Sequence, residues 1–196
     1  MTALPVSSRA FMIAAALVMG LSAATAGKAS AAKFEGVVLV PPAQSETRSP
    51  QFKRGQIVDF QTRQKPGSIV IVTRDKALYY ILGNGKAVKY RVATAKRGFE
   101  WRGTNQVSAK VKWPDWRPPA TMRKRRPDLP VHMAGGPENP LGARAIYLGS
   151  TIYRIHGTNE PSSIGKAASS GCIRMLNADV AELFRHVKLG ATVTVV

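Results

Sequence analysis

GSIVIVTRDKALYYILGNGKAVKYRVA, residues 67–93, holds three runs of β-branched and aromatic residues separated by turn-forming residues. The first run, Ser68–Thr73, ends at the polar residues 74–76. The second, Ala77–Leu82, is closed by Gly-Asn-Gly-Lys at 83–86, which favours a hairpin with the third run, Ala87–Ala93. The stretch therefore predicts consecutive, largely antiparallel strands at the start of a folded domain.

The pattern continues toward the C-terminus as short strands with one convincing helix. Residues after Asn177 carry an apolar stripe of helical period, with acidic side chains in the first turns. Asn177 is the expected N-cap and Gly190 the expected stop. Many short strands and one or two short helices predict a mostly β domain over residues 67–196. The further strands are expected at 107–111, 145–148, 151–156 and 191–196.

A long irregular stretch interrupts these strands at residues 113–139. Six prolines rule out a continuous helix or a central strand there. The stretch also carries Trp113, Trp116 and the basic run 123–126. Loops of this length in a compact domain are often functional. We expect either an ordered lid over a site, with the basic run recruiting anionic substrate, or tryptophans that plug the edge of the core.

The N-terminal part has the composition of an export signal followed by a tether. Residues 1–26 combine Arg9, an apolar run and Ala24-Thr25-Ala26, a small-x-small cleavage pattern. An uncleaved membrane anchor is the alternative reading. Residues 27–66 read as a flexible tether, in which residues 37–40 could add a strand. We therefore expect export to the periplasm or cell wall, with no integral membrane domain after signal cleavage.

The net charge of +18 favours a polyanionic partner. Export removes most nucleic acids from reach, and the basic residues form no recognisable nucleic-acid-binding motif. Anionic lipid or an acidic wall polymer then remains. The sequence contains no metal-ligand constellation and no phosphate-binding loop, so we expect no cofactor and no metal.

Cys172 is the single cysteine of the chain. In an exported protein it is an inert buried thiol, half of an intermolecular disulfide or a reactive thiol. His156 lies sixteen positions earlier and is a candidate base for a thiol nucleophile. Gly171 would let a substrate approach the backbone, whose N–H groups could face an oxyanion. Arg174 could bind a carboxylate, lower the thiol pKa or brace the loop; the residues alone leave a structural role equally open.

Four motifs resemble those of the YkuD-type L,D-transpeptidases, in particular the periplasmic branch. These are residues 132–137 (HMAGGP), 139–142 (NPLG), 153–158 (YRIHGT) and 169–175 (SSGCIRM). The likeness extends over about residues 67–196 and includes the upstream tryptophans and prolines. Many members of this family carry histidine where this chain has Ser170, which puts in doubt only the role of a second histidine.

The resemblance implies a β-sandwich-like catalytic domain with the cysteine in a loop beneath a lid. It implies that Cys172 attacks the carbonyl of the third stem residue of peptidoglycan, diaminopimelate, releases D-alanine and forms a thioester, with His156 as base. An amine acceptor then resolves the thioester. The residues expected to support substrate or oxyanion are Ser169, Ser170, Gly171, Arg174, Gly157 and His132.

The sequence does not specify the acceptor that resolves the thioester. It is another stem peptide (a 3→3 crosslink), the lysine of an outer-membrane lipoprotein, or a free D-amino acid. With water as acceptor the protein would be an L,D-carboxypeptidase. Two further alternatives are a non-catalytic wall-binding module and a sortase-like transpeptidase, whose arginine usually lies well beyond the cysteine. The resemblance implies a role in cell wall biogenesis, cell shape and peptidoglycan biosynthesis.

Overall fold

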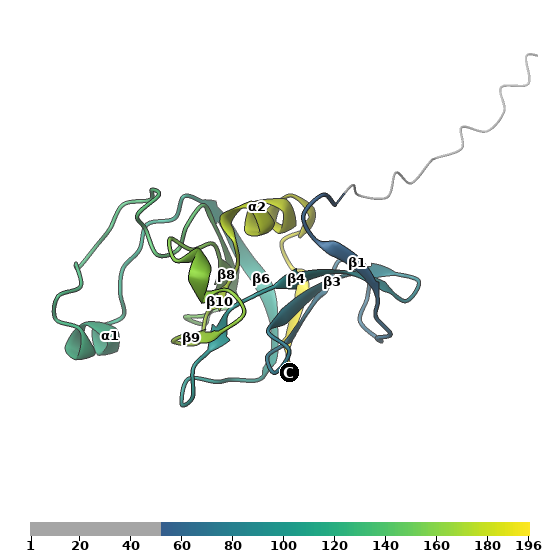
Figure 1. Ribbon diagram of the computed structural model, residues 1–196, viewed down its shortest axis with the longest axis horizontal. Coiled ribbons are helices and arrows are strands. Elements are labelled where there is room, and N and C mark those ends of the chain that lie inside the picture. The colour runs from purple at the N-terminus through teal and green to yellow at the C-terminus, as the bar shows by residue number, and fades with distance from the viewer. Residues whose placement is uncertain (1–51) are drawn as a thin grey trace, which may run out of the picture. The chain divides into compact units, whose positions relative to one another are not determined.

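A computed structural model describes residues 52–196 of the chain. The expected signal at 1–26 and most of the expected tether lie outside these residues. The described part is built around a nine-stranded mixed sheet and a separate two-stranded sheet (Figure 1). The strands are β1 Gln56–Asp59, β2 Ile69–Val72, β3 Ala77–Gly83, β4 Lys86–Arg91, β5 Thr94–Ala95, β6 Gly103–Lys112, β7 Arg144–Leu148, β8 Arg154–His156, β9 Ala167–Ser169, β10 Ile173–Arg174 and β11 Thr192–Val195.

The strand order in the large sheet is β1-β4-β3-β2-β11-β6-β7-β8-β10, and β5 pairs with β9. The long strand β6 joins the two halves of this sheet. Its first part pairs antiparallel with β11 and its last part with β7, with a register shift between Val107 and Ala109. A bulge of this kind bends and twists a strand. β6 therefore links the hairpin half, built from residues 56–91, to the half that carries the site.

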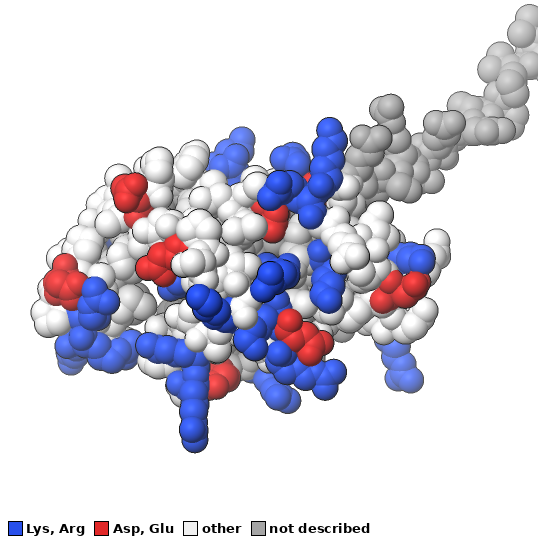
Figure 2. Space-filling model, in the orientation of Figure 1, with Lys and Arg blue, Asp and Glu red and all other residues white. Residues whose placement is uncertain are grey.

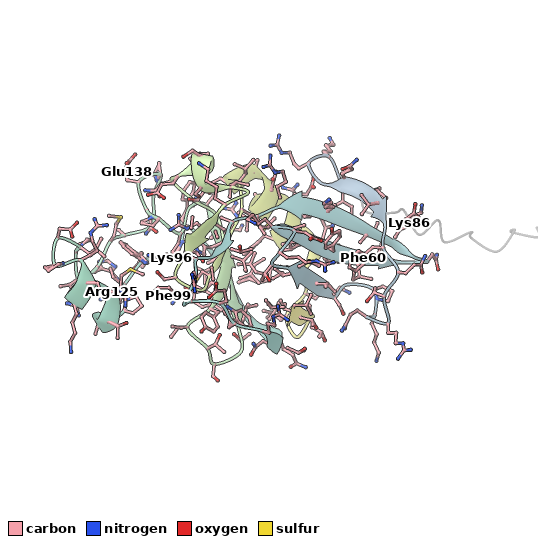
Figure 3. The ribbon with its side chains drawn as sticks, turned by 60° about the horizontal axis from the view of Figure 1, so that its bottom comes forward. Phe60, Lys86, Lys96, Phe99, Arg125 and Glu138 are labelled. Atoms are coloured by element: carbon pink, nitrogen blue, oxygen red, sulfur yellow. The ribbon has the colours of Figure 1, made fainter. Side chains whose placement is uncertain are left out.

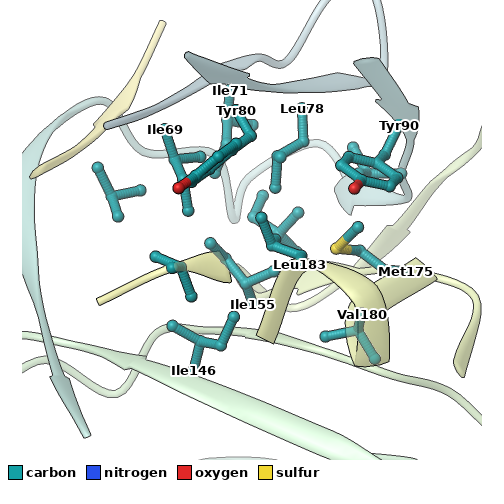
Figure 4. Close-up of a cluster of buried hydrophobic side chains, with 14 of the residues drawn as sticks. Ile69, Ile71, Leu78, Tyr80, Tyr90, Ile146, Ile155, Met175, Val180 and Leu183 are labelled. Atoms are coloured by element: carbon teal, nitrogen blue, oxygen red, sulfur yellow. The ribbon is translucent and has the colours of Figure 1, made fainter. Parts of the chain in front are cut away.

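Two α-helices and one 3-10 turn accompany the strands: α1 Ala120–Arg125, α2 Asn177–His186 and η1 Pro161–Ser163. Helix α2 lies over the sheet and buries Val180 and Leu183 completely. Figure 4 shows these two side chains packed with Ile155, Met175 and residues of β2–β4 in the main core cluster. Burying one such aliphatic side chain stabilises a fold by roughly 1.5–3 kcal/mol.

The predicted mostly β fold with one or two short helices is confirmed, including the hairpin β3–β4. The helix differs in detail from the expectation. Asn177 is its first residue rather than its N-cap, and its side chain makes no capping hydrogen bond. The helix ends at His186, before Gly190, because Val187 already has an extended backbone.

Residues 52–66 were expected to belong to the tether, yet the structure pairs β1 with β4. A buried carboxylate holds the segment just before β1. Glu182 of α2 accepts backbone N–H groups from Lys53, Arg54 and Gly55 at 2.7–3.2 Å, and the hydroxyl of Tyr90 at 2.9 Å. Burial alone would raise the pKa of Glu182, but these bonds hold it below its ordinary value. We call this set of hydrogen bonds to Glu182 the Glu182 clasp. It could not be predicted from the sequence, because the segment before β1 has the basic, polar composition of a tether.

In the part of the chain from 52 to 196, no helix has both the length and the apolar character needed to cross a bilayer.

Candidate active site

The site is organised by two short parallel strands, β8 and β10. Their register places Ile173 opposite Ile155 and Arg174 opposite His156. Side chains alternate between the two faces of a strand. Ile155 and Ile173 therefore both point into the core, where they are 0% and 1% exposed. Arg154, His156, Cys172 and Arg174 share the opposite face, Cys172 being the residue just before β10.

That face forms the floor of a cleft of about 360 Å³. Cys172, His156, Arg154 and Arg174 all line it, together with Ser169 and Ser170. The opposite wall comes from the 113–139 stretch through α1 and its flanks: Trp116, Pro119, Met122, Arg125, Arg126 and Leu129. The cleft thus lies between the sheet and the arm that extends to the left in Figure 1.

His156 is buried and neutral. Its Nδ1–H donates to the carbonyl oxygen of Gly157 at 2.6 Å, since a carbonyl can only accept. This bond leaves Nε2 as the free acceptor of the ring. Burial lowers the pKa of His156 to about 3, and the guanidiniums of Arg174 and Arg154 act in the same direction. The ring can therefore take a proton during a reaction without carrying one at rest.

The Cys172 thiol is also in its neutral form at rest. The residue is partly exposed, but its sulfur is desolvated, and burial raises the pKa of the thiol. Hydrogen bonds and the positive charge of Arg154 oppose that shift without cancelling it. The thiol donates to the carbonyl oxygen of Ile152 at 3.8 Å rather than to His156. The hydrogen bond recorded for the thiol at rest is thus to the backbone.

The turn that presents Cys172 is fixed by three contacts. The Ser169 hydroxyl donates to the Cys172 carbonyl at 2.5 Å and accepts the Gly171 N–H at 3.2 Å. The Trp101 indole N–H donates to the Gly171 carbonyl at 2.7 Å, and its ring stacks on Tyr153 at 4.4 Å. Gly171 has φ +112°, and a Cβ there would lie 2.5 Å from Tyr153. The Gly171 N–H is occupied by Ser169, so here Gly171 supports the turn and offers no free oxyanion donor.

Asn177 holds the loop that follows His156. Its Oδ1 accepts the N–H groups of Ala143 and Thr158 at 3.0 and 3.1 Å, and its Nδ2 donates to the Thr158 carbonyl at 3.0 Å. Gly157 makes this approach possible, because a Cβ at that position would lie 2.1 Å from Asn177 Oδ1. The same loop carries the Gly157 carbonyl that orients His156. Asn177 therefore positions the loop that orients the His156 ring, from the start of α2.

Residues 113–139 form an arm whose two ends are joined by hydrogen bonds. The buried Asn139 donates to the carbonyls of Pro114, Met133 and Ala134 at 3.0–3.2 Å. Trp116 and Met133 exchange backbone hydrogen bonds at 2.8 Å. Trp116 lines the cleft, as a lid residue would, whereas Trp113 is 46% exposed and neither lines the cleft nor plugs the core.

His132 lies apart from the cleft lining. Its Nε2 contacts Asp115 Oδ2 at 3.0 Å, and Asp115 also accepts the Gly135 N–H at 3.1 Å. These bonds lower the pKa of Asp115 and brace the base of the arm. His132 was expected to support substrate or oxyanion, whereas its contact with Asp115 in the structure is a structural one.

Cys172, His156, Ser169, Ser170 and Arg174 are thus brought to one cleft. Sequence reasoning missed three residues that act on this centre: Arg154, Trp101 and Asn177. The first had a readable signal. Arg154-Ile155-His156 and Cys172-Ile173-Arg174 repeat the same polar-isoleucine-polar pattern, which places all four polar side chains on one face of paired strands. Trp101 and Asn177 had no such signal, because their contacts join distant segments.

Comparison with known proteins identifies the architecture. Residues 66–195 match the family model described as “YkuD: L,D-transpeptidase catalytic domain”. A curated relative from Fuscovulum blasticum, “Putative L,D-transpeptidase in ATP synthase subunits region ORF 5”, is 33% identical over 183 residues, covering 87% of this chain and 93% of that protein. Several other curated relatives, also named L,D-transpeptidases, are longer, and the chain spans about half of their length.

Two solved structures share the fold. An L,D-transpeptidase from Mycobacterium smegmatis superposes with a TM-score of 0.53 at 18% identity, over 65% of this chain and 57% of that one. A Brucella melitensis protein named “Probable carnitine operon oxidoreductase caia” has a TM-score of 0.50 at 43% identity, over 72% and 92% of the two chains. That name points to another enzyme class, whereas the family model and the curated relatives agree with one another.

Proposed function

The chain belongs to the YkuD family of L,D-transpeptidase catalytic domains, and we propose that it is a cysteine transpeptidase of peptidoglycan, with Cys172 as nucleophile and His156 as base. L,D-transpeptidases act on the cell wall, which lies outside the cytoplasm. Export by the N-terminal residues 1–26 belongs to the same proposal, with a tether that ends before the segment held by Glu182 and β4.

One observation carries the assignment. The single cysteine and a neutral histidine lie on one face of two paired strands, in one cleft. Because the Nδ1–H of His156 is held by the Gly157 carbonyl, its Nε2 is available as an acceptor. A nucleophile beside a base that a third group orients is the arrangement that covalent catalysis requires.

The acylation step follows from this geometry. His156 Nε2 takes the thiol proton as the sulfur attacks the carbonyl of the third stem residue. The tetrahedral intermediate collapses, the peptide bond to D-alanine breaks, and His156 returns the proton to the leaving amine. The product is a thioester on Cys172. Burial favours the neutral forms of both groups at rest, so His156 can accept the thiol proton during acylation.

An acceptor amine completes the cycle. His156 removes a proton from the amine, the amine attacks the thioester carbonyl, and the Cys172 thiolate leaves and is reprotonated. The acceptor is a second stem peptide, giving a 3→3 crosslink, or the lysine of an outer-membrane lipoprotein. Water in the same position would give an L,D-carboxypeptidase. Arg154 stands beside the thiol and would stabilise the thiolate at both steps.

The test uses the purified full chain with a disaccharide-tetrapeptide and product identification by mass spectrometry. Cys172→Ala should form no product, because no thioester can form. His156→Ala should slow acylation by a carbapenem by about 10²–10⁴-fold. His186→Ala is the matched control, since His186 packs on Phe52 away from the cleft. Turnover by Cys172→Ala would refute the mechanism, and wild-type acylation by His156→Ala would refute the role of His156 as base.

A further inference from the structure

The cleft is strongly cationic. Five basic side chains line it, Lys96, Arg125, Arg126, Arg154 and Arg174, and the single carboxylate in the lining is that of Glu160. Figure 2 shows lysine and arginine side chains gathered below α1 and β9, on the side where the arm meets the domain. This imbalance attracts anions into the cleft by simple Coulomb attraction.

Two of the five cations are already neutralised. Arg174 donates to Glu160 Oε2 at 2.9 Å, and Arg126 binds both carboxylate oxygens of Asp128 at 2.8 and 2.6 Å. The Arg154 guanidinium lies over the Tyr147 ring, with its Cζ 5.0 Å from the ring centroid. Within residues 52–196, neither Lys96 nor Arg125 has a carboxylate oxygen within 4.0 Å. These two cations therefore carry no counter-charge from that part of the protein.

Lys96 and Arg125 meet at one aromatic ring. The Lys96 Nζ lies 5.3 Å, and the Arg125 Cζ 5.1 Å, from the centroid of Phe99 (Figure 3). Lys96 and Phe99 belong to the loop after β5, which is tied to the nucleophile turn by the bond from Lys96 N–H to the Ser169 carbonyl at 3.0 Å. Arg125 comes from α1 on the arm. The ring therefore gathers two like charges from opposite walls of the cleft.

Each cation gains modestly from the aromatic ring, and an anion near the ring would be attracted by both charges. A carboxylate beside Phe99 would satisfy both, and it would also fasten the arm to the domain over the Cys172 cleft. A neutral amide in the same place would gain little from either charge.

We propose that Lys96, Phe99 and Arg125 form a carboxylate-binding subsite that selects stem peptides with free, non-amidated carboxyl groups. The inference rests on the proposed function, since it names the class of stem that the same cleft takes. Diaminopimelate carries a carboxyl group besides the one joined to D-alanine, and amidation of such a group removes its charge. The subsite is thus a determinant of substrate specificity, separate from the thiol chemistry.

Binding should be measured with the full chain carrying Cys172→Ala, so that no turnover interferes. The ligands are a tetrapeptide with free carboxyl groups and the same peptide with its side carboxyl groups amidated, titrated by calorimetry at two salt concentrations. In that background, Arg125→Gln and Lys96→Gln should each weaken binding of the free peptide by about two- to fivefold. They should barely change binding of the amidated peptide, and the loss should shrink at high salt.

Lys124→Gln is the matched control, because Lys124 sits next to Arg125 on α1 but lines a separate hollow on the other side of the helix. It should leave both affinities unchanged, and Arg125→Lys should restore much of the preference because it keeps the charge. If the Cys172→Ala chain bound the free and the amidated peptide equally well, the subsite would be refuted. It would also be refuted if Lys124→Gln weakened binding of the free peptide as much as Arg125→Gln does. A failure of the proposed function would be seen in a different experiment, in which the wild-type chain would form no product from the disaccharide-tetrapeptide.

Discussion

Asn177→Ala is the sharpest single test of how the fold places His156, the proposed base. The substitution removes an amide that joins three points: the N–H of Ala143, and both the N–H and the carbonyl of Thr158. No contact to Cys172 is touched. The loop bearing the Gly157 carbonyl, which holds the His156 ring, loses its link to α2.

The magnitude follows from these bonds. Three hydrogen bonds at about 1 kcal/mol each, with the stranded N–H groups only partly able to reach water, predict a loss of about 2–4 kcal/mol in unfolding free energy. At about 3 °C for each kcal/mol, the melting temperature should fall by about 6–12 °C. Displacement of the base by about 1 Å should slow acylation by about 10²-fold.

The assay is carbapenem acylation of the full chain, followed by mass spectrometry at a temperature where circular dichroism shows the variant folded. Asn177→Asp is informative beside it, because the carboxylate keeps both acceptor bonds and loses only the donor to Thr158. It should acylate at an intermediate rate. Asn159→Ala is the control, since Asn159 is exposed and makes one hydrogen bond, to the Glu138 carbonyl at 2.8 Å. Wild-type acylation by folded Asn177→Ala would refute the positioning role.

Three further predictions concern the Cys172 thiol, the hydrogen bonds to Glu182, and the turn before Cys172. Because burial raises the pKa of Cys172 and lowers that of His156 to about 3, alkylation by iodoacetamide should climb steadily through pH 9; a plateau between pH 5 and 8 would reveal a preformed ion pair instead. Glu182→Gln should cost about 2–4 kcal/mol of unfolding free energy at pH 7. The fold lowers the pKa of Glu182, so its ionised carboxylate contributes fully to stability above pH 4.5, and this contribution is lost as the pH falls through the folded pKa. Urea titrations should therefore show the difference in unfolding free energy between wild type and Glu182→Gln shrinking in acid. A difference that stays constant with pH would contradict the assignment. Trp101→Phe should slow acylation about fivefold, as expected for the loss of one hydrogen bond to Gly171, and an unchanged rate would make that bond incidental.

The hairpin and the helix could be predicted because their signals are local. The alternation in residues 67–93 and the apolar stripe after Asn177 each follow from the geometry of one element. β1 and α1 escaped prediction for a physical reason. β1 is mostly exposed and depends on pairing with β4 and on the Glu182 clasp nearby, and α1 is one short helix in a proline-rich arm.

The sequence by itself supplied the candidates for the chemistry: a lone cysteine preceded by glycine, a histidine sixteen residues earlier, and motifs that resemble those of the L,D-transpeptidases. Those signals consist of residue types and their spacing, which can be read without a structure. Only the tertiary structure decided the protonation of the pair, which depends on desolvation and on Arg154. It also separated Arg125 and Arg126, which face the cleft, from Arg123 and Lys124 beside them, which line another hollow. Burial and electric field are sums over neighbours from distant segments, so no local pattern in the chain contains them.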